Sequence, residues 1–460
     1  MAGSAYIERG SVTPTSEQVF SFSAWVKFSD VTSSTEQMIF NQTRDGVSTD
    51  SCNFYKKAGG TLTLYVVSGS SNLIDLNTDR KFVDCGAWYN LAFSINMADS
   101  TTGDRAQIFV NGVRETAFAT ATYPTTQNIN CMDDNASNRT RIGGGAKESA
   151  TVNMYLDGDL SHVNFVDGVA YAGSNWGSTD STSGIWKIDP EPTVSSYGNR
   201  GFFLKMEDSS NLDLDSSPNA TTMTTSGTLT ATEDNPSNNF CTANPLANQT
   251  SSSFVYTNGN NKVASTTSGW RSVYPTLGYE TGKWYWETKC AAVGSDVATG
   301  VCATTQVTGT ASAFSESTPG DNGWGYKNGA IKSWGGDSTV ERAYGDTYTT
   351  GDIIGCAHDN TNGVIWWSKN GVWQDSATIE EIAAGTTTNA AYASMTTGLT
   401  ILPATQYNGT TGWEYNFGNG YFGSTAVTSA NADDAGIGAM EYDVPTGYYC
   451  LCTKNISTYG

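Results

Sequence analysis

The stretch Phe20-Ser-Phe-Ser-Ala-Trp-Val-Lys-Phe28 decides the fold class. Every second side chain from Phe20 to Phe28 is apolar, and most of the positions between them are polar. Because successive side chains of a β-strand point to opposite faces of a sheet, this alternation predicts a half-buried strand. Similar runs, separated by Ser, Thr, Asn and Gly, occur at residues 37–40, 61–67, 88–95, 106–110, 153–156, 161–166 and 201–205. Many short strands at this spacing predict a β-sandwich or barrel.

Turn chemistry in the second half of the chain predicts an antiparallel meander. Strand patterns occur at residues 283–289, 297–302, 330–334, 353–358, 364–368 and 413–417. Asn-Gly pairs begin at Asn322, Asn328, Asn362 and Asn370, and this dipeptide strongly favours a two-residue β-hairpin turn. Helical periodicity is nearly absent, and residues 377–384 are expected to form two helical turns at most.

The composition agrees with many short strands and restricts the function. The 460 residues include 49 glycines, and 24 basic against 45 acidic side chains give a net charge of −21. Binding to phosphates needs a positive field, so we expect no nucleic-acid partner. No apolar run approaches the roughly 18 residues of a membrane helix and the first residues show no leader pattern, so we expect no membrane insertion and folding in a reducing cytoplasm. Nine cysteines without a Cys-x-x-Cys pattern predict buried thiols.

The length allows two or three domains. Residues 208–268 are rich in Ser, Thr, Asn and Ala, which is typical of a linker or of an irregular wrap over a core. We therefore predict an all-β chain of two antiparallel β-sandwich (jelly-roll-like) domains in tandem, at residues 1–207 and 269–460, joined by residues 208–268.

Motifs in the first half resemble a laminin-G-like module of the concanavalin A-like lectin sandwiches. They are Phe22-Ser-Ala-Trp-Val-Lys, Met38-Ile-Phe-Asn, Leu62-Thr-Leu-Tyr, Ala87-Trp-Tyr-Asn-Leu-Ala-Phe, Gln107-Ile-Phe-Val-Asn-Gly-Val113, Arg141-Ile-Gly-Gly and Tyr155-Leu-Asp-Gly-Asp-Leu-Ser-His-Val. Their order and spacing match the family over residues 5–207, so the resemblance implies a lectin-type sandwich in this part of the chain.

Five motifs in the second half resemble a SPRY module, which is another antiparallel sandwich. They are Gly282-Lys-Trp-Tyr-Trp-Glu287, Gly323-Trp-Gly-Tyr326, Gly351-Asp-Ile-Ile-Gly-Cys-Ala-His-Asp359, Gly363-Val-Ile-Trp-Trp-Ser-Lys-Asn-Gly371 and Tyr415-Asn-Phe-Gly418. His358 stands where the family usually has an aliphatic residue, and Trp367 where it usually has Tyr or Phe. The resemblance implies that loops at one edge of the sandwich bind a partner.

The whole arrangement resembles structural proteins of tailed bacteriophages, particularly marine ones, in which such modules sit on tail or capsid appendages. Three connecting pieces carry this resemblance: Phe202-Phe-Leu-Lys-Met, Asp234-Asn-Pro-Ser-Asn-Asn-Phe and Pro445-Thr-Gly-Tyr-Tyr-Cys-Leu-Cys. The sequence shows no heptad run for a trimeric stalk, which favours a compact appendage or decoration subunit over a long fibre.

An aromatic set in the second module is the candidate ligand-binding surface. Its members are Trp324, Tyr326, Trp334, Tyr344, Trp366 and Trp373. Alternation along a strand places only one of Trp366 and Trp367 in the core, so the other would face outward near Trp373, which follows the hairpin turn. Ordinary packing inside the sandwich is the alternative role for each of these residues.

Oxygen-bearing side chains at every second residue mark a candidate calcium site. The pattern is Asp213-x-Asp215-x-Ser217-x-Asn219, and hard cations such as calcium prefer oxygen ligands spaced in this way. Asp133-Asp134-Asn135 and Asp157-x-Asp159 are further candidates. Calcium is therefore the one cofactor considered, although none is required, and a solvated acidic loop is the alternative.

The sequence offers few arrangements of residues that could carry out catalysis. Lectin-type sandwiches that cleave glycans carry Glu-x-Asp-x-x-Glu on one strand, whereas Glu441-Tyr-Asp443-Val-Pro-Thr446 lacks the second glutamate that a retaining mechanism needs. His358 and Asp359 are neighbours on a strand and point to opposite faces, so we expect His358 to be a hydrogen-bonded interior residue. We predict that the protein is not an enzyme.

These observations lead to one main hypothesis and two alternatives. The main hypothesis is a non-enzymatic phage virion structural protein, a tail or capsid appendage, fibre or decoration subunit. It would assemble in the host cytoplasm as a homo-oligomer with other virion proteins, and bind host surface glycan or protein from the particle surface, weakly per site but strongly through many copies. The first alternative is a purely structural cement subunit without a host ligand, and the second is a glycan-degrading tailspike.

Overall fold

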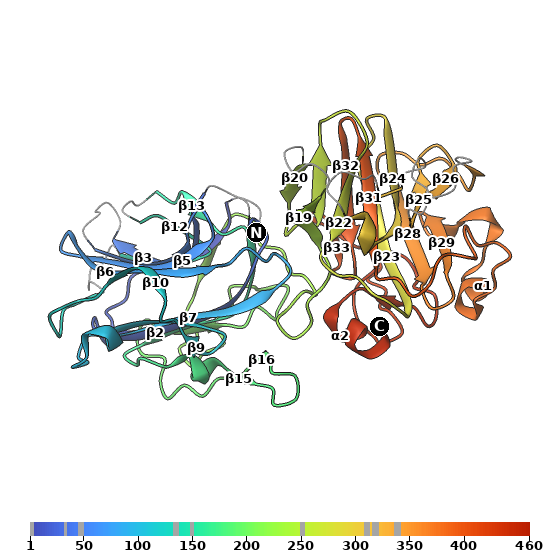
Figure 1. The fold of residues 1–460 in the computed structure, drawn as a ribbon. Helices are drawn as coiled ribbons and strands as arrows, with labels where there is room; N and C mark the ends of the chain where they lie inside the picture. The colour runs from blue at the N-terminus through green and yellow to red at the C-terminus, as the bar shows by residue number, and fades with distance from the viewer. Residues whose placement is uncertain are drawn as a thin grey trace. The chain divides into compact units, whose positions relative to one another are not determined.

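The computed structural model describes residues 4–31, 35–44, 50–131, 138–147, 151–248, 254–307, 313–314, 322–334 and 342–460. The chain forms two compact units, Met1–Ala231 and Thr232–Gly460. Each unit is a β-sandwich whose main sheets are antiparallel (Figure 1). The structure thus confirms the predicted all-β fold with two sandwiches in tandem.

The first unit packs an eight-stranded sheet against a six-stranded sheet, and both are labelled in Figure 1. The eight-stranded sheet has the order β10 (Phe118–Thr122), β6 (Ser71–Lys81), β5 (Thr61–Ser68), β4 (Ser51–Lys56), β3 (Gln37–Arg44), β11 (Asn138–Ile142), β1 (Tyr6–Arg9) and β18 (Thr224–Ser226). The six-stranded sheet has the order β17 (Phe202–Leu204), β14 (Gly158–Asp167), β2 (Val19–Phe28), β7 (Trp88–Asn96), β8 (Ala106–Val110) and β9 (Val113–Arg114). Two small hairpins accompany them, β12 (Gly144–Gly145) with β13 (Met154–Tyr155), and β15 (Gly177–Thr179) with β16 (Trp186–Ile188).

Strand β2 contains the alternating stretch and lies inside the six-stranded sheet. Its phenylalanines point into the core between the sheets, where Phe22 stacks on Phe93 with ring centroids 5.5 Å apart. The other face, predicted to be exposed, is also buried. Residues 169–197 supply a further apolar layer there, which includes Trp176, and Ser21 Oγ donates a hydrogen bond to the Val169 carbonyl at 3.0 Å.

The second unit packs two sheets around a core rich in tryptophan and tyrosine. One sheet has the order β19 (Ala243–Asn248), β22 (Arg271–Pro275), β31 (Ile401–Asn408), β24 (Asp296–Ala303), β25 (Gly323–Lys327), β26 (Ile331–Trp334) and β27 (Arg342–Ala343). The other has the order β20 (Phe254–Thr257), β21 (Lys262–Ser265), β32 (Thr411–Asn416), β23 (Lys283–Ala292), β28 (Ile353–Asp359), β29 (Val364–Lys369) and β30 (Val372–Trp373), and β35 (Tyr449–Cys450) pairs in parallel with β23. A further small hairpin joins β33 (Tyr421–Phe422) to β34 (Thr425–Ala426).

The predicted meander and its turn are confirmed in β28, β29 and β30. Asn370 and Gly371 link β29 to β30 and have φ values of 49° and 80°, as the positive-φ hairpin turn requires. The short helix predicted at residues 377–384 is also present as α1 (Ile379–Ala384). Thr378 and Glu381 cap it reciprocally, because each side chain accepts a hydrogen bond from the other's backbone N–H. A second helix, α2 (Thr453–Tyr459), was not predicted.

The structure divides the segment expected to be a linker between the two units. Strand β18 pairs with β1 in the first unit, whereas β19, β20 and β21 belong to the sheets of the second. In the first part of this segment, hydrogen bonds to side chains hold much of the backbone in place, and apolar residues do not alternate along it. The Asp215 carboxylate accepts hydrogen bonds from the N–H groups of Phe203, Ser217 and Thr221 at 2.9, 2.9 and 2.8 Å. The boundary between the units therefore lies between Ala231 and Thr232.

Two further expectations concern cysteines and membrane segments. All nine cysteines are buried, as predicted. Among the residues described, no helix is both long enough and apolar enough to span a bilayer.

Candidate functional site

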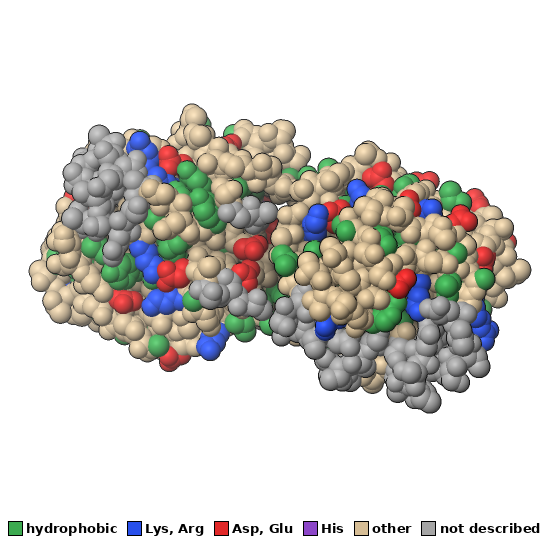
Figure 2. Space-filling model, turned by 90° about the horizontal axis from the view of Figure 1, so that it is seen from above, with side chains coloured by type: hydrophobic (Ala, Val, Ile, Leu, Met, Phe, Trp, Pro, Cys, Tyr) green, Lys and Arg blue, Asp and Glu red, His purple; other side chains and the backbone are tan. Residues whose placement is uncertain are grey.

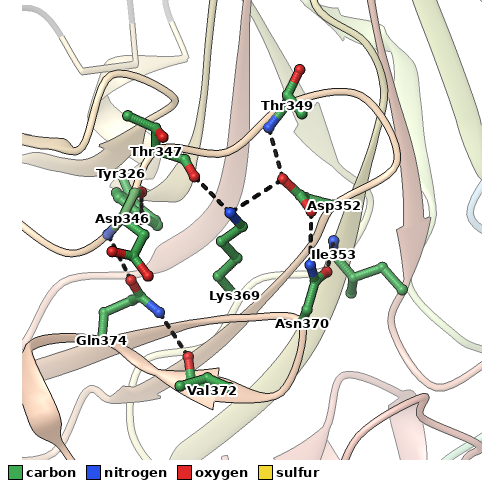
Figure 3. Close-up of polar contacts among 10 residues, drawn as sticks. All are labelled: Tyr326, Asp346, Thr347, Thr349, Asp352, Ile353, Lys369, Asn370, Val372 and Gln374. Atoms are coloured by element: carbon green, nitrogen blue, oxygen red, sulfur yellow. Dashed lines mark hydrogen bonds and ion pairs between the residues drawn. The ribbon is translucent and has the colours of Figure 1, made fainter.

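The candidate site lies in the second unit, where the β29–β30 hairpin meets the loop that precedes β28 (Figure 3). We call residues 344–352 and 369–376 the hairpin surface. The Lys369 ammonium donates a hydrogen bond to the Thr347 carbonyl at 2.7 Å, and its Nζ lies 3.5 Å from Asp352 Oδ2. A single side chain from the end of β29 therefore holds two points of the loop.

Asn370 fastens the same loop from the turn. Its Nδ2 donates to Asp352 Oδ1 at 2.7 Å, and its Oδ1 accepts from the Ile353 N–H at 2.8 Å. Asp352 also accepts from the Thr349 N–H at 2.9 Å. Partial burial raises the pKa of Asp352, but these hydrogen bonds and the Lys369 charge outweigh burial, so the pKa lies below its usual value. The carboxylate therefore stays charged at neutral pH and the network stays intact.

Gln374 provides the third set of hydrogen bonds that hold the loop. Its Oε1 accepts from the Asp346 N–H at 2.7 Å and its Nε2 donates to the Val372 carbonyl at 2.8 Å, while the Tyr326 hydroxyl donates to the Asp346 carbonyl (Figure 3). The backbone next to it is strained, because the non-glycine residues Asp375 and Ser376 have φ values of 54° and 64°. The hairpin surface is thus held in one conformation by its own side chains.

Apolar side chains stand at the tip of this rigid frame. Val372 is 67% exposed, and Trp373 is half-buried with its ring 6.2 Å from that of Tyr285. A Cβ added to Gly371 would lie 2.6 Å from the Tyr442 ring, so the turn and Tyr442 are in close contact. Val372 and the edge of Trp373 are therefore the apolar groups that this surface offers to a partner.

Most of the predicted aromatic set does not form a surface. Trp324, Tyr326, Tyr344 and Trp366 are at most 2% exposed, so the prediction that they form a binding rim is wrong for these four residues. The side chain of Trp334, at the end of β26, lies outside what the structure describes. Among the members of the set whose side chains the structure describes, Trp373 alone is placed where it can contact a partner.

The physical reason differs within the set: Trp324, Tyr326 and Tyr344 lie in the core between the two sheets, whereas Trp366 is covered by a third layer of the second unit. Trp366 and Trp367 point to opposite faces of β29, as alternation requires, and yet both are completely buried. Trp367 lies in the core between the sheets, while Trp366 lies on the outer face beneath Ile382 of α1 and residues 440–452. Ordinary packing, the alternative role considered for these aromatic residues, is therefore the role of Trp366.

The candidate calcium residues serve a turn. The three hydrogen bonds to Asp215 occupy both of its carboxylate oxygens, and Ser217 Oγ accepts from the Asn219 N–H at 3.3 Å. Asn219 Nδ2 donates to the carbonyls of Gly198 and Gly201, and Asp213 Oδ2 accepts from Thr225 Oγ1 at 2.7 Å. Within the described part of the chain, no cluster of three or more His, Cys, Asp or Glu side chains could hold a metal ion. Asp133, Asp134 and Asn135 lie outside the described residues.

The residues weighed for catalysis have structural partners. Glu441 accepts hydrogen bonds from the Thr428 N–H at 2.7 Å and from Thr428 Oγ1 at 2.5 Å. His358 is completely buried with its Nδ1 2.8 Å from the Tyr279 hydroxyl, so the predicted hydrogen-bonded interior role is confirmed. Burial lowers the pKa of His358 to about 3. A neutral imidazole with no access to solvent is poorly placed for general-base work.

A second polar surface lies on the outer face of the eight-stranded sheet in the first unit. Cross-strand pairing places a row of side chains across this face: Glu8, Arg141, Asn41, Asn53, Tyr65 and Asp75. Arg141 Nε lies 2.6 Å from Glu8 Oε2, and Asn41 Nδ2 donates to Asn53 Oδ1 at 2.7 Å and to the Ala146 carbonyl at 3.1 Å. In the view from above, hydrophobic, basic and acidic side chains lie side by side over the first unit (Figure 2). The middle of the row is buried, because both Asn41 and Asn53 are fully covered.

The residues that build the hairpin surface were not singled out from the sequence, apart from Trp373 and Tyr344. Asp352 and Lys369 stand inside two of the SPRY-like motifs and Gln374 in none, and no pattern in the sequence indicates that these three side chains hold one loop. The Asn370-Gly371 turn was recognised, and it identified the hairpin but not the loop that the hairpin holds.

Comparisons with known proteins match one described domain family within each unit. Residues 2–173 match the family model of the concanavalin A-like lectin/glucanases superfamily, and residues 283–402 match that of the SPRY domain. Both matches agree with the resemblances carried by the sequence motifs. A search of curated proteins found no match.

Solved structures show distant similarity. The SPRY domain of human HERC1 is 16% identical, with 38% of this chain and 96% of that chain covered and a TM-score of 0.29. Another human SPRY domain is 12% identical over 35% and 93% of the two chains, with a TM-score of 0.24. The native heptameric SAP-like pentraxin from Limulus polyphemus is 15% identical over 40% and 85%, with a TM-score of 0.29.

Proposed function

We propose, for a chain that carries a concanavalin A-like domain followed by a SPRY domain, the function of a non-enzymatic binding protein of a tailed-bacteriophage virion. In this proposal the protein is an appendage or decoration subunit that attaches the particle to a glycan or protein on the host surface. The two domain types support the binding role, and the connecting motifs near Phe202, Asp234 and Pro445 support the phage origin.

The observation that supports the binding role is that hydrogen bonds hold the hairpin surface in place. Lys369, Asn370 and Gln374 fix the loop and the turn before any partner arrives, so association orders little additional backbone. The exposed Val372 supplies apolar contact area at the tip. A rigid frame with a small apolar tip suits a contact of modest strength, and many copies on one particle would multiply its effect.

The proposal of a non-enzymatic protein rests on the hydrogen-bond partners and the burial of the residues considered as catalytic acid or base. Glu441 is engaged by Thr428, and His358 is enclosed and neutral. The remaining carboxylate of that motif, Asp443, has no second carboxylate at the spacing that a retaining glycosidase needs.

A binding assay with the full chain tests the proposal. Purified protein, displayed in many copies on beads, is offered to host cells and to an array of host surface glycans. Val372→Asp places a charge at the apolar tip and is expected to weaken cell binding about tenfold or more, because one buried apolar contact is replaced by an uncompensated carboxylate. Val255→Asp is the matched control, because Val255 is 63% exposed on β20 of the same unit and lies outside the hairpin surface.

Each outcome decides a different part of the proposal. Equal binding by the two variants and the parent protein removes the hairpin surface as the site. If the parent protein binds neither cells nor glycans, host attachment fails, and a purely structural cement subunit becomes the better description. A reconstruction of the source particle, with both domains fitted into the density, then shows whether the chain is part of the virion.

A further inference from the structure

Two cysteines of the second unit, Cys450 and Cys452, stand one residue apart where β35 ends. Both side chains are completely buried. They pack in the apolar cluster that covers the outer face of β29, whereas Leu451 between them packs in the core between the two sheets. The two cysteine side chains therefore lie on the same side of the backbone.

A tight turn brings the two cysteines together. The Cys452 N–H donates a hydrogen bond to the Cys450 carbonyl at 3.1 Å, which is the bond of a three-residue γ-turn. Such a turn is shorter than the roughly 6.7 Å that residues two apart span in a strand, and disulfides join Cα atoms about 4.4–6.8 Å apart. The two sulfurs are in contact, because the Cys450 thiol donates a hydrogen bond to the Cys452 sulfur. The backbone thus holds both sulfurs where a small side-chain movement can join them.

Hydrogen bonds around the pair give the two sulfurs different roles. The Cys450 thiol and the Asn238 side chain donate to the Cys452 sulfur, and they lower the pKa of Cys452 although burial opposes them. The contact with Cys452 and burial raise the pKa of Cys450, so Cys450 stays a thiol. Its sulfur donates to the Ile437 carbonyl at 3.7 Å and lies 3.3 Å from Asn455 Nδ2. Cys452 is therefore the sulfur that attacks, and Cys450 the one that follows.

Cys290 and Cys302 show that burial alone does not make such a pair. Both are completely buried in the same unit, and burial raises the pKa of both thiols. They belong to strands of different sheets, β23 and β24, and to different apolar clusters. These two cysteines are therefore a natural control for Cys450 and Cys452.

We propose that Cys450 and Cys452 are a redox pair that closes to a disulfide with a small disulfide oxidant such as oxidised glutathione. The Cys452 thiolate attacks one sulfur of the oxidant, so a mixed disulfide forms and one glutathione thiolate leaves. Cys450 then loses its proton and attacks the Cys452 sulfur, and the second glutathione leaves. The released glutathiones take up the two protons, so two protein thiols and one glutathione disulfide become one protein disulfide and two glutathione thiols.

The reaction requires the segment around β35 to open, because both sulfurs are covered. This segment is held by short pairings: β35 has two residues, Cys452 forms an isolated bridge with Phe240, and the Cys241 N–H donates to the Leu451 carbonyl at 3.0 Å. Segments with so few backbone pairings open locally without global unfolding. A disulfide fixes the turn in this segment, so oxidation is expected to slow the opening. This redox chemistry does not depend on the proposed host contact.

Peptide mapping of the full chain tests the proposal. Folded protein is kept at neutral pH with about 1 mM reduced or oxidised glutathione, and the remaining thiols are alkylated in denaturant before digestion with trypsin. The tryptic peptide 370–454 contains two cysteines, Cys450 and Cys452. In the oxidised sample it is expected to lack two hydrogen atoms and to carry no alkyl group, and dithiothreitol should restore both thiols. The peptide 290–327, with Cys290 and Cys302, should be alkylated twice in both samples.

Two variants separate the steps. Cys450→Ala removes the second thiol, so Cys452 is expected to take up one glutathione and to stop at the mixed disulfide. Cys452→Ala removes the attacking sulfur, so Cys450 is expected to remain a thiol over the same time. Cys302→Ala is the matched control and should form the disulfide as the parent protein does. The mapping of the parent protein uses no substitution, so it decides the proposal even if a variant fails to fold.

Amide hydrogen exchange measures what the bond does to the segment. Amides of residues 450–456 should exchange several-fold more slowly in the oxidised protein than in the reduced protein, whereas those of β5 in the first unit should not change. Equal exchange in the two forms would overturn the effect on opening. The redox pair itself is overturned if both thiols stay alkylatable after prolonged exposure to oxidised glutathione in mild urea, or if glutathione adducts or bonds between chains form in place of the ring.

Discussion

The two sandwiches have similar layers but different cores. In the first unit, phenylalanine and aliphatic side chains fill the space between the sheets, and Phe93 lies 5.3–6.2 Å from the rings of four other phenylalanines: Phe20, Phe22, Phe40 and Phe54. In the second unit, tryptophan and tyrosine take this place, so polar atoms enter the core with them. The first core depends mainly on shape, and the second depends also on hydrogen bonds.

Several buried polar atoms of the second unit find partners within it, whereas Trp367 Nε1 and His358 Nε2 have no hydrogen-bond partner among the described residues. Trp284 Nε1 donates to the Thr281 carbonyl at 2.7 Å, and Trp413 Nε1 donates to the Gln406 carbonyl at 3.1 Å. Glu287, also completely buried, accepts from the N–H groups of Glu441 and Tyr442 at 2.9 and 2.8 Å. Such an interior is specific but sensitive to the loss of any one partner.

Removing a phenylalanine ring from the first core is expected to have the largest effect. Phe93→Ala should lower the free energy of unfolding of the first unit by about 4 kcal/mol, because it removes the ring and leaves a cavity among four aromatic neighbours. Chemical denaturation monitored by tyrosine and tryptophan signals should show the first unit unfolding earlier while the second is unchanged. A shift of both units together would show that their stabilities are coupled.

The second unit is expected to respond to pH through Glu287, which lies on the outer face of β23 beside Tyr285, Glu441 and Tyr442. Burial raises the pKa of Glu287 to about 7, against the opposing effect of its hydrogen bonds. The unfolded chain releases this proton near pH 4.5 and the folded chain only near pH 7, so the contribution of Glu287 to stability is largest below pH 4.5 and falls as the pH rises to about 7. The loss amounts to something on the order of 3 kcal/mol.

The variant Glu287→Gln separates this contribution from that of His358. The lowered pKa of His358 acts in the opposite direction, because its contribution is lost as the pH falls from 6.5 toward 3. The informative quantity is therefore the difference in unfolding free energy between the parent protein and Glu287→Gln, measured at several pH values. The parent protein should lose stability relative to the variant between pH 4.5 and 7, and a constant difference would contradict the assignment.

Local patterns predicted the strands and turns but not what covers them. The alternation from Phe20 to Phe28 and the Asn370-Gly371 turn depend on neighbouring residues, and the strand and the turn are confirmed, although the face of the strand expected to be exposed is buried. The burial of Trp366 depends on Ile382 and Met440, which are distant in sequence and follow no period relative to it. A tryptophan that faces solvent and one that lies beneath a third layer have the same local sequence pattern. The prediction that Trp366 belongs to a binding surface was therefore wrong.

The strands within residues 208–268, where the sequence predicted a linker or an irregular wrap over a core, were not predicted for a related reason. A strand such as β18 has three residues, which is too short to show a period, and Asp215 holds the chain by hydrogen bonds to backbone groups. The oxygen spacing that suggested calcium at Asp213, Asp215, Ser217 and Asn219 is also the spacing of side chains that close consecutive turns. Sequence spacing alone does not separate a ligand for a cation from an acceptor for N–H groups.

The smallest expected effect on stability concerns the hairpin surface. Lys369→Met removes the ammonium that joins Thr347 to Asp352 but keeps the length of the side chain. Because the ion pair is partly exposed, with side-chain exposures of 25% and 17%, its removal should cost only about 0.5–1 kcal/mol in the second unit. Lys187→Met, which removes the exposed ion pair with Asp180 in the first unit, is the matched control and should leave the free energy of unfolding nearly unchanged.

The effect of Lys369→Met on binding should exceed its effect on stability. Lys369, Asn370 and Gln374 each hold the loop of residues 344–352. Without the Lys369 ammonium one of these three sets of interactions is lost, so a partner must order the loop when it binds. Cell binding by Lys369→Met should therefore weaken several-fold, with the melting temperature nearly unchanged, whereas Lys187→Met should bind like the parent protein. Lys369→Met could instead lower the melting temperature and leave cell binding unaltered. That result would show that the Lys369 interactions stabilise the fold alone and that the hairpin surface is not the site of cell binding.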